Sequence, residues 1–325
     1  VSPLTTEVGG HNAALTDGPA NTGTQVLDPT AHLLAGTVLV QNLQKVTVNN
    51  AKSGVDFGFN FDTIVNTNDA GQGSLRQFIL NANLLAGESN LAQVGLTAGL
   101  ENSIFMIPGA GPHTITPASV LPSLTGAATA LNAVTQAGAS CAASGRTPKI
   151  GLDGTSAGVN TSGLTIDASN VVVRGFAIGK FTEAGVLGTA NADTMSVVCN
   201  NLGLATDGST VTANGTNGLY VKVGASNLQV GGNTDDDRNI VSGNTRDGIR
   251  LEGVATATVS RNYIGTDASG TSARSNNREG ASYAGIYAGK PAVGTATTSS
   301  ALTIRNNLIS GNDVLTGAAP IYNVS

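Results

Sequence analysis

The stretch Asn239-Ile240-Val241-Ser242-Gly243-Asn244 decides the fold, because its pattern returns along the second half of the chain. An Asn is followed two residues later by an aliphatic residue, and the phrase Ser-Gly-Asn comes back at 310–312. The pairs that share this pattern are Asn200 with Leu202, Asn239 with Val241, Asn262 with Ile264, and Asn307 with Ile309. Such recurrence over tens of residues is typical of a repeat architecture.

Two further short elements accompany each of these pairs. The runs that precede the Asn are rich in β-formers: Val171–Arg174, Ser196–Cys199, Asn227–Val230, Thr258–Arg261 and Leu302–Arg305. A Gly followed by an aliphatic residue recurs at 185–186, 218–219, 248–249 and 285–286. Each repeat therefore contains three short strands, which we expect to stack in parallel, coil on coil. We expect the aliphatic residues to form ladders, and the recurrent Asn side chains to hydrogen-bond along the stack.

The predicted fold is all-β: a right-handed parallel β-helix, or solenoid, over residues 61–325. Residues 1–60 are not repetitive and predict a small β segment, or the tail of a β-sandwich domain. Leu75, Phe78, Ile79 and Ala82 have helical spacing and follow a capping-box pattern of Ser74 and Gln77. A short helix over 75–85 is expected to cover the N-terminal end of the stack, since an open end of strands needs a cover.

Several motifs resemble the β-helix repeat region of large secreted bacterial surface proteins. The resemblance is carried by Asn66-Thr67-Asn68-Asp69 through Gly73-Ser74-Leu75-Arg76-Gln77 and by Leu152-Asp153-Gly154-Thr155. It continues in Asn239–Asn244 and in Asn262-Tyr263-Ile264-Gly265-Thr266-Asp267. The resemblance implies a module of a cell-surface protein and says little about an activity.

The composition narrows the class of protein. Charged residues make up only 11% of the 325 residues, whereas soluble cytoplasmic enzymes contain about 25%. The net charge is −5 and Lys and Arg form no basic run, which argues against a nucleic-acid partner. No apolar stretch is long enough to span a membrane, and the start at Val1 has no signal-like segment. We therefore expect a mature, trimmed or partial extracellular or cell-surface protein.

The cysteines are Cys141 and Cys199, with no Cys-x-x-Cys or Cys/His grouping. That pattern argues against a zinc site and leaves two alternatives, one disulfide or two buried thiols.

The strongest acidic cluster is Asp235-Asp236-Asp237. Two carboxylates held about 5–9.5 Å apart serve glycoside hydrolysis. However, all three histidines, His11, His32 and His113, precede the repeats, so no such partner accompanies the cluster. We interpret it as an exposed polar turn, with calcium binding as the alternative and calcium as the one cofactor to consider. We assign no catalytic residue and do not expect an enzyme, although a polysaccharide lyase or hydrolase stays open as a second alternative.

A glycan-binding face is the first alternative to a purely structural role. Arg250, Arg261 and Glu252 would form a charged stripe for anionic glycans if they shared one face. Carbohydrate sites usually contain aromatic platforms, yet Trp is absent and Tyr263, Tyr283 and Tyr287 are the nearest grouping. The simpler interpretation is that these residues are solvated outer positions of strands.

The sequence thus favours a structural protein of the bacterial cell surface. After the last coil, Ile304–Ser310, no amphipathic helix follows to cover the stack. We expect its edge to be covered by more chain of a longer protein, or by another copy in a head-to-tail filament.

Overall fold

The computed structural model describes residues 61–85, 99–279, 283–290 and 299–312. In these residues the architecture is almost wholly β, with one α-helix and three 3-10 turns. Every pairing between its named strands is parallel. The predicted all-β class with parallel strands is therefore confirmed. The β segment predicted over 1–60 lies outside the described residues and stays a prediction.

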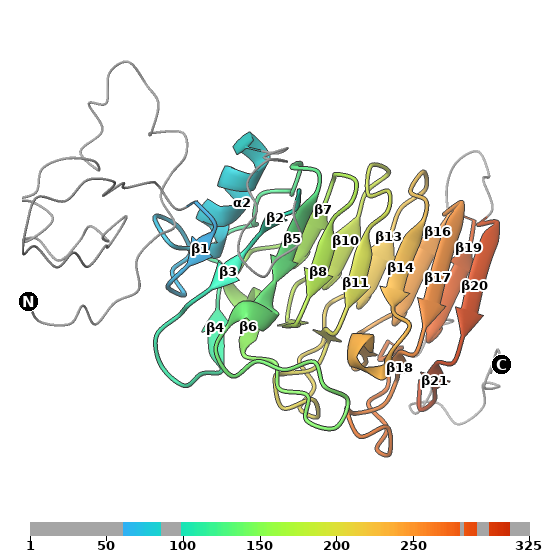
Figure 1. Cartoon of the computed structure of the whole chain (residues 1–325). Helices are drawn as coiled ribbons and strands as arrows, with labels where there is room; N and C mark the ends of the chain where they lie inside the picture. Colours follow the sequence, from blue (N-terminus) through green and yellow to red (C-terminus); the bar gives the residue numbers. More distant parts are fainter. Residues whose placement is uncertain (1–60, 86–98, 280–282, 291–298, 313–325) are drawn as a thin grey trace, which may run out of the picture.

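Three parallel sheets run along the described chain, and Figure 1 shows their strands stacked in a row from the N-terminal to the C-terminal end. Sheet 1 contains β2 (Glu101–Asn102), β5 (Thr129–Asn132), β8 (Val172–Arg174), β11 (Ser196–Val198), β14 (Leu228–Gly231), β17 (Thr256–Ser260) and β20 (Ala301–Arg305). Sheet 2 contains β4 (His113–Ile115), β6 (Ile150–Asp153), β9 (Phe176–Gly179), β12 (Asn201–Leu202), β15 (Ile240–Val241), β18 (Tyr263–Ile264) and β21 (Leu308–Ile309). Sheet 3 contains β7 (Leu164–Ile166), β10 (Val186–Gly188), β13 (Leu219–Val221), β16 (Ile249–Glu252) and β19 (Ile286–Gly289).

The chain visits the three sheets in a fixed order. From β8 onward it passes from sheet 1 to sheet 2 to sheet 3 and then returns to sheet 1, beside the strand that it left. The three recurrent sequence elements correspond to these three sheets. The Gly-aliphatic element, for example, places Val186, Leu219, Ile249 and Ile286 in register across sheet 3.

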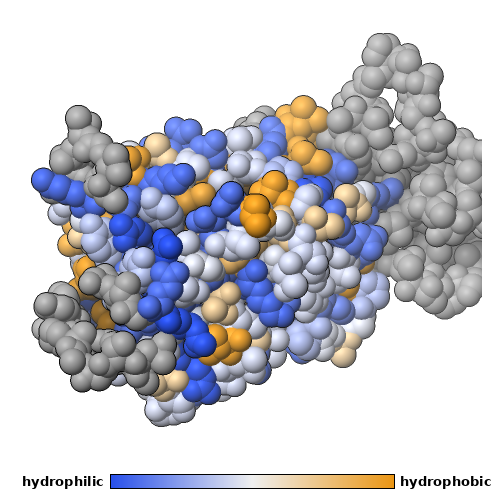
Figure 2. Space-filling view, turned by 180° about the vertical axis from the view of Figure 1, so that it is seen from behind, coloured by the Kyte–Doolittle hydropathy of each residue, from blue (hydrophilic) through white to orange (hydrophobic). Residues whose placement is uncertain are grey.

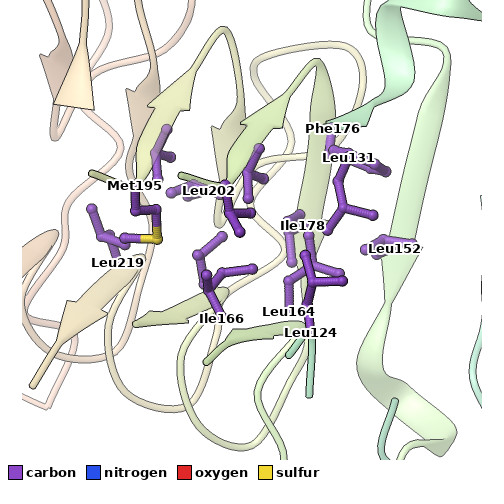
Figure 3. Close-up of a cluster of buried hydrophobic side chains, with 14 of the residues drawn as sticks. Leu124, Leu131, Leu152, Leu164, Ile166, Phe176, Ile178, Met195, Leu202 and Leu219 are labelled. Atoms are coloured by element: carbon purple, nitrogen blue, oxygen red, sulfur yellow. The ribbon is translucent and has the colours of Figure 1, made fainter. Parts of the chain in front are cut away.

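The core lies between the sheets and follows the predicted ladders. Leu202, Val241 and Ile264 are in register in sheet 2 and fully buried. Figure 3 shows part of this core, in which Leu152, Ile178 and Leu202 point toward side chains from the other sheets. Burying one such aliphatic side chain stabilises the fold by about 1.5–3 kcal/mol, so each circuit adds its own increment of stability.

The helix α2 (Leu75–Leu85) lies at the N-terminal end of the stack (Figure 1). Its buried side chains include Leu75, Phe78, Ile79 and Ala82, and beside it lies the small sheet of β1 (Thr63–Ile64) and β3 (Ile104–Phe105). Only half of the expected capping box forms. Ser74 Oγ accepts the backbone N–H of Gln77, but the backbone N–H of Ser74 donates to the carbonyl of Gly71 instead of to the Gln77 side chain, which donates to Asn81.

An Asn ladder stands at the corner between sheets 1 and 2. The side-chain amide of Asn200 donates to Asn239, that of Asn239 to Asn262, and that of Asn262 to Asn307, over 2.8–3.2 Å. The same amides also donate to strand carbonyls, as Asn239 does to Val197 over 2.7 Å. The ladder thus satisfies buried backbone groups where the chain turns out of the sheet.

A second Asn ladder, at the corner between sheets 2 and 3, was not predicted. Its members are Asn214, Asn244, Asn276 and Asn312, joined by amide hydrogen bonds of 3.0, 2.9 and 2.8 Å. Only the repeated Ser-Gly-Asn phrase at 242–244 and 310–312 pointed to it. The chain segments before Asn214 and Asn276 bulge out in small antiparallel excursions, which obscured the register of those two residues.

Candidate functional site

Of the two alternatives for the cysteines, the structure contains the disulfide: Cys141 is joined to Cys199, with their Cα atoms 5.8 Å apart. Cys199 occupies the corner before Asn200, with a φ of +60°, a conformation that non-glycine residues rarely adopt. The bond ties the loop that follows β5 to a coil 58 residues further along the chain. It therefore links two parts of the stack that strand pairing alone does not join.

The Asp cluster forms the short 3-10 turn η4 (Asp235–Asp237), and all three carboxylates have partners. Asp235 pairs with Arg261 at 2.9 Å and Arg238 at 3.2 Å, and the Arg261 hydrogen bond followed by the Arg238 charge lowers the pKa of Asp235. Asp236 accepts the backbone N–H of Ala143 over 2.8 Å, and Asp237 accepts from Thr234. In the described part of the chain no group of three His, Cys, Asp or Glu side chains is placed to hold a metal ion. The geometry gives the calcium alternative no support.

The residues considered for a glycan-binding stripe do not share one face. Arg250 and Glu252 belong to β16 in sheet 3, whereas Arg261 follows β17 in sheet 1 and pairs with Asp235. Tyr263 likewise lies in sheet 2, beneath the guanidinium of Arg238 at 4.0 Å. Only Arg250, Glu252, Tyr283 and Tyr287 come together on the side of sheet 3.

A groove of about 360 Å³, lined mainly by polar and charged residues, lies on that side and crosses several coils. We call it the sheet 3 groove, and its lining residues are Glu183, Thr216, Asn217, Tyr220, Arg246, Asp247, Arg250, Glu252 and Tyr283. Backbone hydrogen bonds align them from coil to coil: Thr216 N–H donates to Glu183, and Arg246 N–H donates to Thr216. The volume is in the lower range of small-ligand sites, which span about 300–1,000 Å³.

Arg250 is the centre of the groove floor. Its guanidinium contacts Asp247 at 2.8 Å and Glu252 at 2.6 Å, and it lies over the ring of Tyr287 at 4.2 Å. Burial acts to lower the pKa of Arg250, but the hydrogen bonds and charges of Asp247 and Glu252 outweigh it and raise the pKa. The two carboxylates therefore hold the guanidinium in place and favour its charged form.

Tyr220 completes the floor next to Glu252. Its hydroxyl donates to Glu252 over 2.7 Å, in register with Arg250 on the neighbouring strand. Burial, followed by the hydrogen bond to Glu252, raises the pKa of Tyr220 to about 12. The phenol therefore stays protonated at neutral pH and acts as a hydrogen-bond donor.

The other residues that line the groove have fewer hydrogen-bond and ion-pair partners within the protein. Arg246 is 42% exposed, contacts Glu279 at 3.2 Å and lies 5.4 Å from the ring centre of partly exposed Tyr283. Within the described residues the carboxylate of Glu183 forms no ion pair, and the buried hydroxyl of Thr216 has no hydrogen-bond partner. Arg246 thus provides donors and Glu183 provides acceptors in the lining of the groove.

Sequence reasoning identified Arg250, Glu252 and Tyr283 but missed Glu183, Tyr220 and Asp247. Tyr220 and Arg250 each follow the buried aliphatic residue of a Gly-aliphatic element, so the repeat register itself was the available signal.

No family model and no curated protein matches the chain. In the described residues no helix is both long and apolar enough to cross a membrane.

Proposed function

We propose that this protein is an extracellular structural module of the bacterial cell surface, built as a right-handed parallel β-helix that joins end to end with other copies. The repeated passage through three parallel sheets supports the β-helix. Crossovers between parallel strands of one sheet are right-handed in about 98% of cases, which supports the handedness. The sequence resemblance to β-helix regions of secreted surface proteins points to the same class.

The extracellular location is supported by two independent features. Disulfides such as Cys141–Cys199 persist in oxidising compartments and are rare in the cytosol. The surface is also polar with few charges, and the face seen in Figure 2 is mainly hydrophilic to neutral, with scattered apolar residues. That composition suits a rigid wall or spacer.

The observation that carries end-to-end joining is the state of the last coil among the described residues. β19, β20 and β21 end their three sheets, and no strand among the described residues pairs with their outer edges. The inward-facing Leu302, Ile304 and Ile309 are only partly buried, although their register partners Ala257, Val259 and Ile264 are buried. An end of this kind is a template for further pairing.

The opposite end of the stack also exposes apolar side chains. Leu80 and Leu84 of α2 are 46% and 59% exposed, and Met106 and Val120 beside it are exposed as well. Val120 lies against the helix, since Arg76 donates to its carbonyl over 2.7 Å. Two different apolar ends on one rod favour a heterologous contact, which propagates as a filament.

Electron microscopy and sedimentation of the full chain at several concentrations test this proposal. We expect rods that lengthen with concentration by whole subunits. The double variant Leu80→Glu/Leu84→Glu should shorten them to single rods, because it places two carboxylates in the contact.

The matched control is Val159→Glu, since Val159 is 81% exposed away from both ends. It should assemble like the parent chain. A chain that stays monomeric at high concentration, or assembly that the α2 variant leaves intact, would overturn the end-to-end proposal.

A further inference from the structure

We propose that the sheet 3 groove binds a neutral carbohydrate, a ligand of one or two sugar units. This inference goes beyond a structural role and does not depend on end-to-end joining. It rests on the charge of the groove, on its hydrogen-bonding groups and on the ring of Tyr283.

The charge of the groove selects against acidic sugars. Three carboxylates, Glu183, Asp247 and Glu252, line it against two guanidinium groups, Arg246 and Arg250. Arg250 is neutralised by its contacts with Asp247 and Glu252, and Arg246 contacts Glu279. A uronate or a sulfated sugar would therefore meet a net negative surface. This differs from the anionic glycan that the sequence left open as an alternative.

The polar groups match the hydroxyls of a neutral sugar. A sugar hydroxyl both donates and accepts a hydrogen bond, so it needs acceptors and donors side by side. Glu183 provides acceptor oxygens and Arg246 provides N–H donors, and Thr216 lies between them in the backbone register. Hydrogen bonds to charged groups are the stronger kind, which suits a ligand that carries no charge itself.

The ring of Tyr283 supplies the apolar contact. It is partly exposed at the rim, with the Arg246 guanidinium 5.4 Å from its centre. An aromatic ring beside converging polar groups is the usual composition of a small-ligand site. The C–H face of a sugar ring is the part of the ligand that this surface fits.

The groove is rigid before any ligand arrives. Tyr220, Glu252 and Arg250 are locked by mutual contacts of 2.6–2.7 Å on the paired strands β13 and β16. Asp247 is further held by the backbone N–H of Ala284 over 2.7 Å. A preformed site loses little conformational entropy when a ligand binds, so its contacts contribute more fully to the affinity.

Calorimetry or saturation-transfer NMR on the full chain tests this inference. The probes are neutral disaccharides of glucose, galactose and mannose, with digalacturonate as the acidic comparison and putrescine as a cationic one. We expect a neutral disaccharide to bind at millimolar concentration or better, and digalacturonate to bind at least tenfold more weakly.

Two substitutions locate the site without touching the locked floor. Glu183→Gln should weaken binding about tenfold, the scale of one hydrogen bond to a charged group. Tyr283→Ala should also weaken binding about tenfold, because it removes the apolar contact of the ring. Tyr263→Ala and Asp236→Asn are the matched controls outside the groove and should leave binding unchanged.

Absence of neutral-sugar binding, preference for digalacturonate or for putrescine, or equal affinity in the Glu183 and Tyr283 variants would each overturn the proposal. Circular dichroism of every variant confirms that the stack is intact. End-to-end assembly of these variants should be unaffected, so failure here is distinguishable from failure of the structural proposal.

Discussion

The side-chain oxygen of Asn239 accepts two hydrogen bonds from Asn200, one from its backbone N–H at 2.9 Å and one from its side-chain amide at 3.2 Å. Both residues are fully buried. The side-chain oxygen of Asn239 thus accepts hydrogen bonds at the corner of the preceding coil, while its side-chain amide donates to the Asn of the next coil. The corners of the stack are consequently as tightly specified as its apolar core.

Replacing Asn239 by Ala should destabilise the protein by about 3 kcal/mol or more. The change leaves the buried backbone N–H of Asn200 without its acceptor and removes the amide that donates to Val197 and Asn262, and each loss at a buried group costs about 1–3 kcal/mol. Denaturant unfolding followed by circular dichroism measures the difference. The exposed Asn233 makes only a 3.4 Å contact with Arg305, so Asn233→Ala should have little effect. Equal midpoints for the two variants would contradict a stabilising role for the ladder.

Reducing the Cys141–Cys199 bond should lower the free energy of unfolding by about 4 kcal/mol. A cross-link that closes a loop of 58 residues restricts the unfolded chain by about this amount in the loop-entropy description. The measurement compares urea unfolding with and without reductant. A Cys141→Ser/Cys199→Ser double variant should match the reduced protein and not respond to reductant. If reduction leaves the parent chain's midpoint unchanged, the bond contributes nothing to stability.

Replacing Arg146 by Met should stabilise the protein by about 1–3 kcal/mol. Burial, followed by the charges of Arg238 and Arg174, lowers the pKa of Arg146 to about 9. Its guanidinium donates to the carbonyl of Arg238, but its Nε and Nη2 groups are buried without a partner among the described residues. Met keeps the aliphatic packing and removes the unsatisfied charge.

Arg76 is the matched control for Arg146. It pairs with Asp69 at 2.7 Å and donates to the carbonyls of Ser119 and Val120. Arg76→Met should therefore destabilise the chain, whereas Arg146→Met should stabilise it, and thermal unfolding of the two variants measures both effects. A loss of stability in Arg146→Met as well would show that the buried guanidinium is compensated.

The contribution of Asp69 to stability should depend on pH. The hydrogen bond from Arg76 holds the pKa of Asp69 below its usual value of 3.8, so the folded state favours the ionised form. Its stabilisation is therefore present above pH 4 and lost as the pH falls through the lowered pKa. Because the pair is partly exposed, we expect about 1 kcal/mol or less. Asp69→Asn should be less stable than the parent chain at pH 7 and equal to it near pH 2; a gap that persists at pH 2 would contradict this.

The fold was largely predictable because each coil repeats the same sequence pattern. The aliphatic residues Leu202, Val241 and Ile264 and the residues Asn200, Asn239 and Asn262 have a fixed offset in the sequence. A fixed offset in every coil places like side chains above one another in a parallel stack. The second ladder was missed because excursions before Asn214 and Asn276 shift their position within the repeat.

The groove was only partly predictable because its residues come from different coils. The groove brings together residues that are distant in the sequence: Glu183, Tyr220, Asp247 and Tyr283. None of them belongs to a sequence motif that indicates a function. The sequence also grouped Arg261 with Arg250, although the structure places them on different sheets.

The sequence by itself determined the parallel strands, the aliphatic ladder and the first Asn ladder, because these depend on short-range spacing that repeats along the chain. The helix at 75–85 likewise follows from local spacing. The contacts of Arg250 with Asp247 and Glu252 also form within one coil. Only the tertiary structure decided which charges meet between coils, as when Arg261 pairs with Asp235 and Arg146 is buried without a carboxylate. Charged side chains pair according to their distance in space. Insertions between coils change these distances without changing the repeat pattern of the sequence.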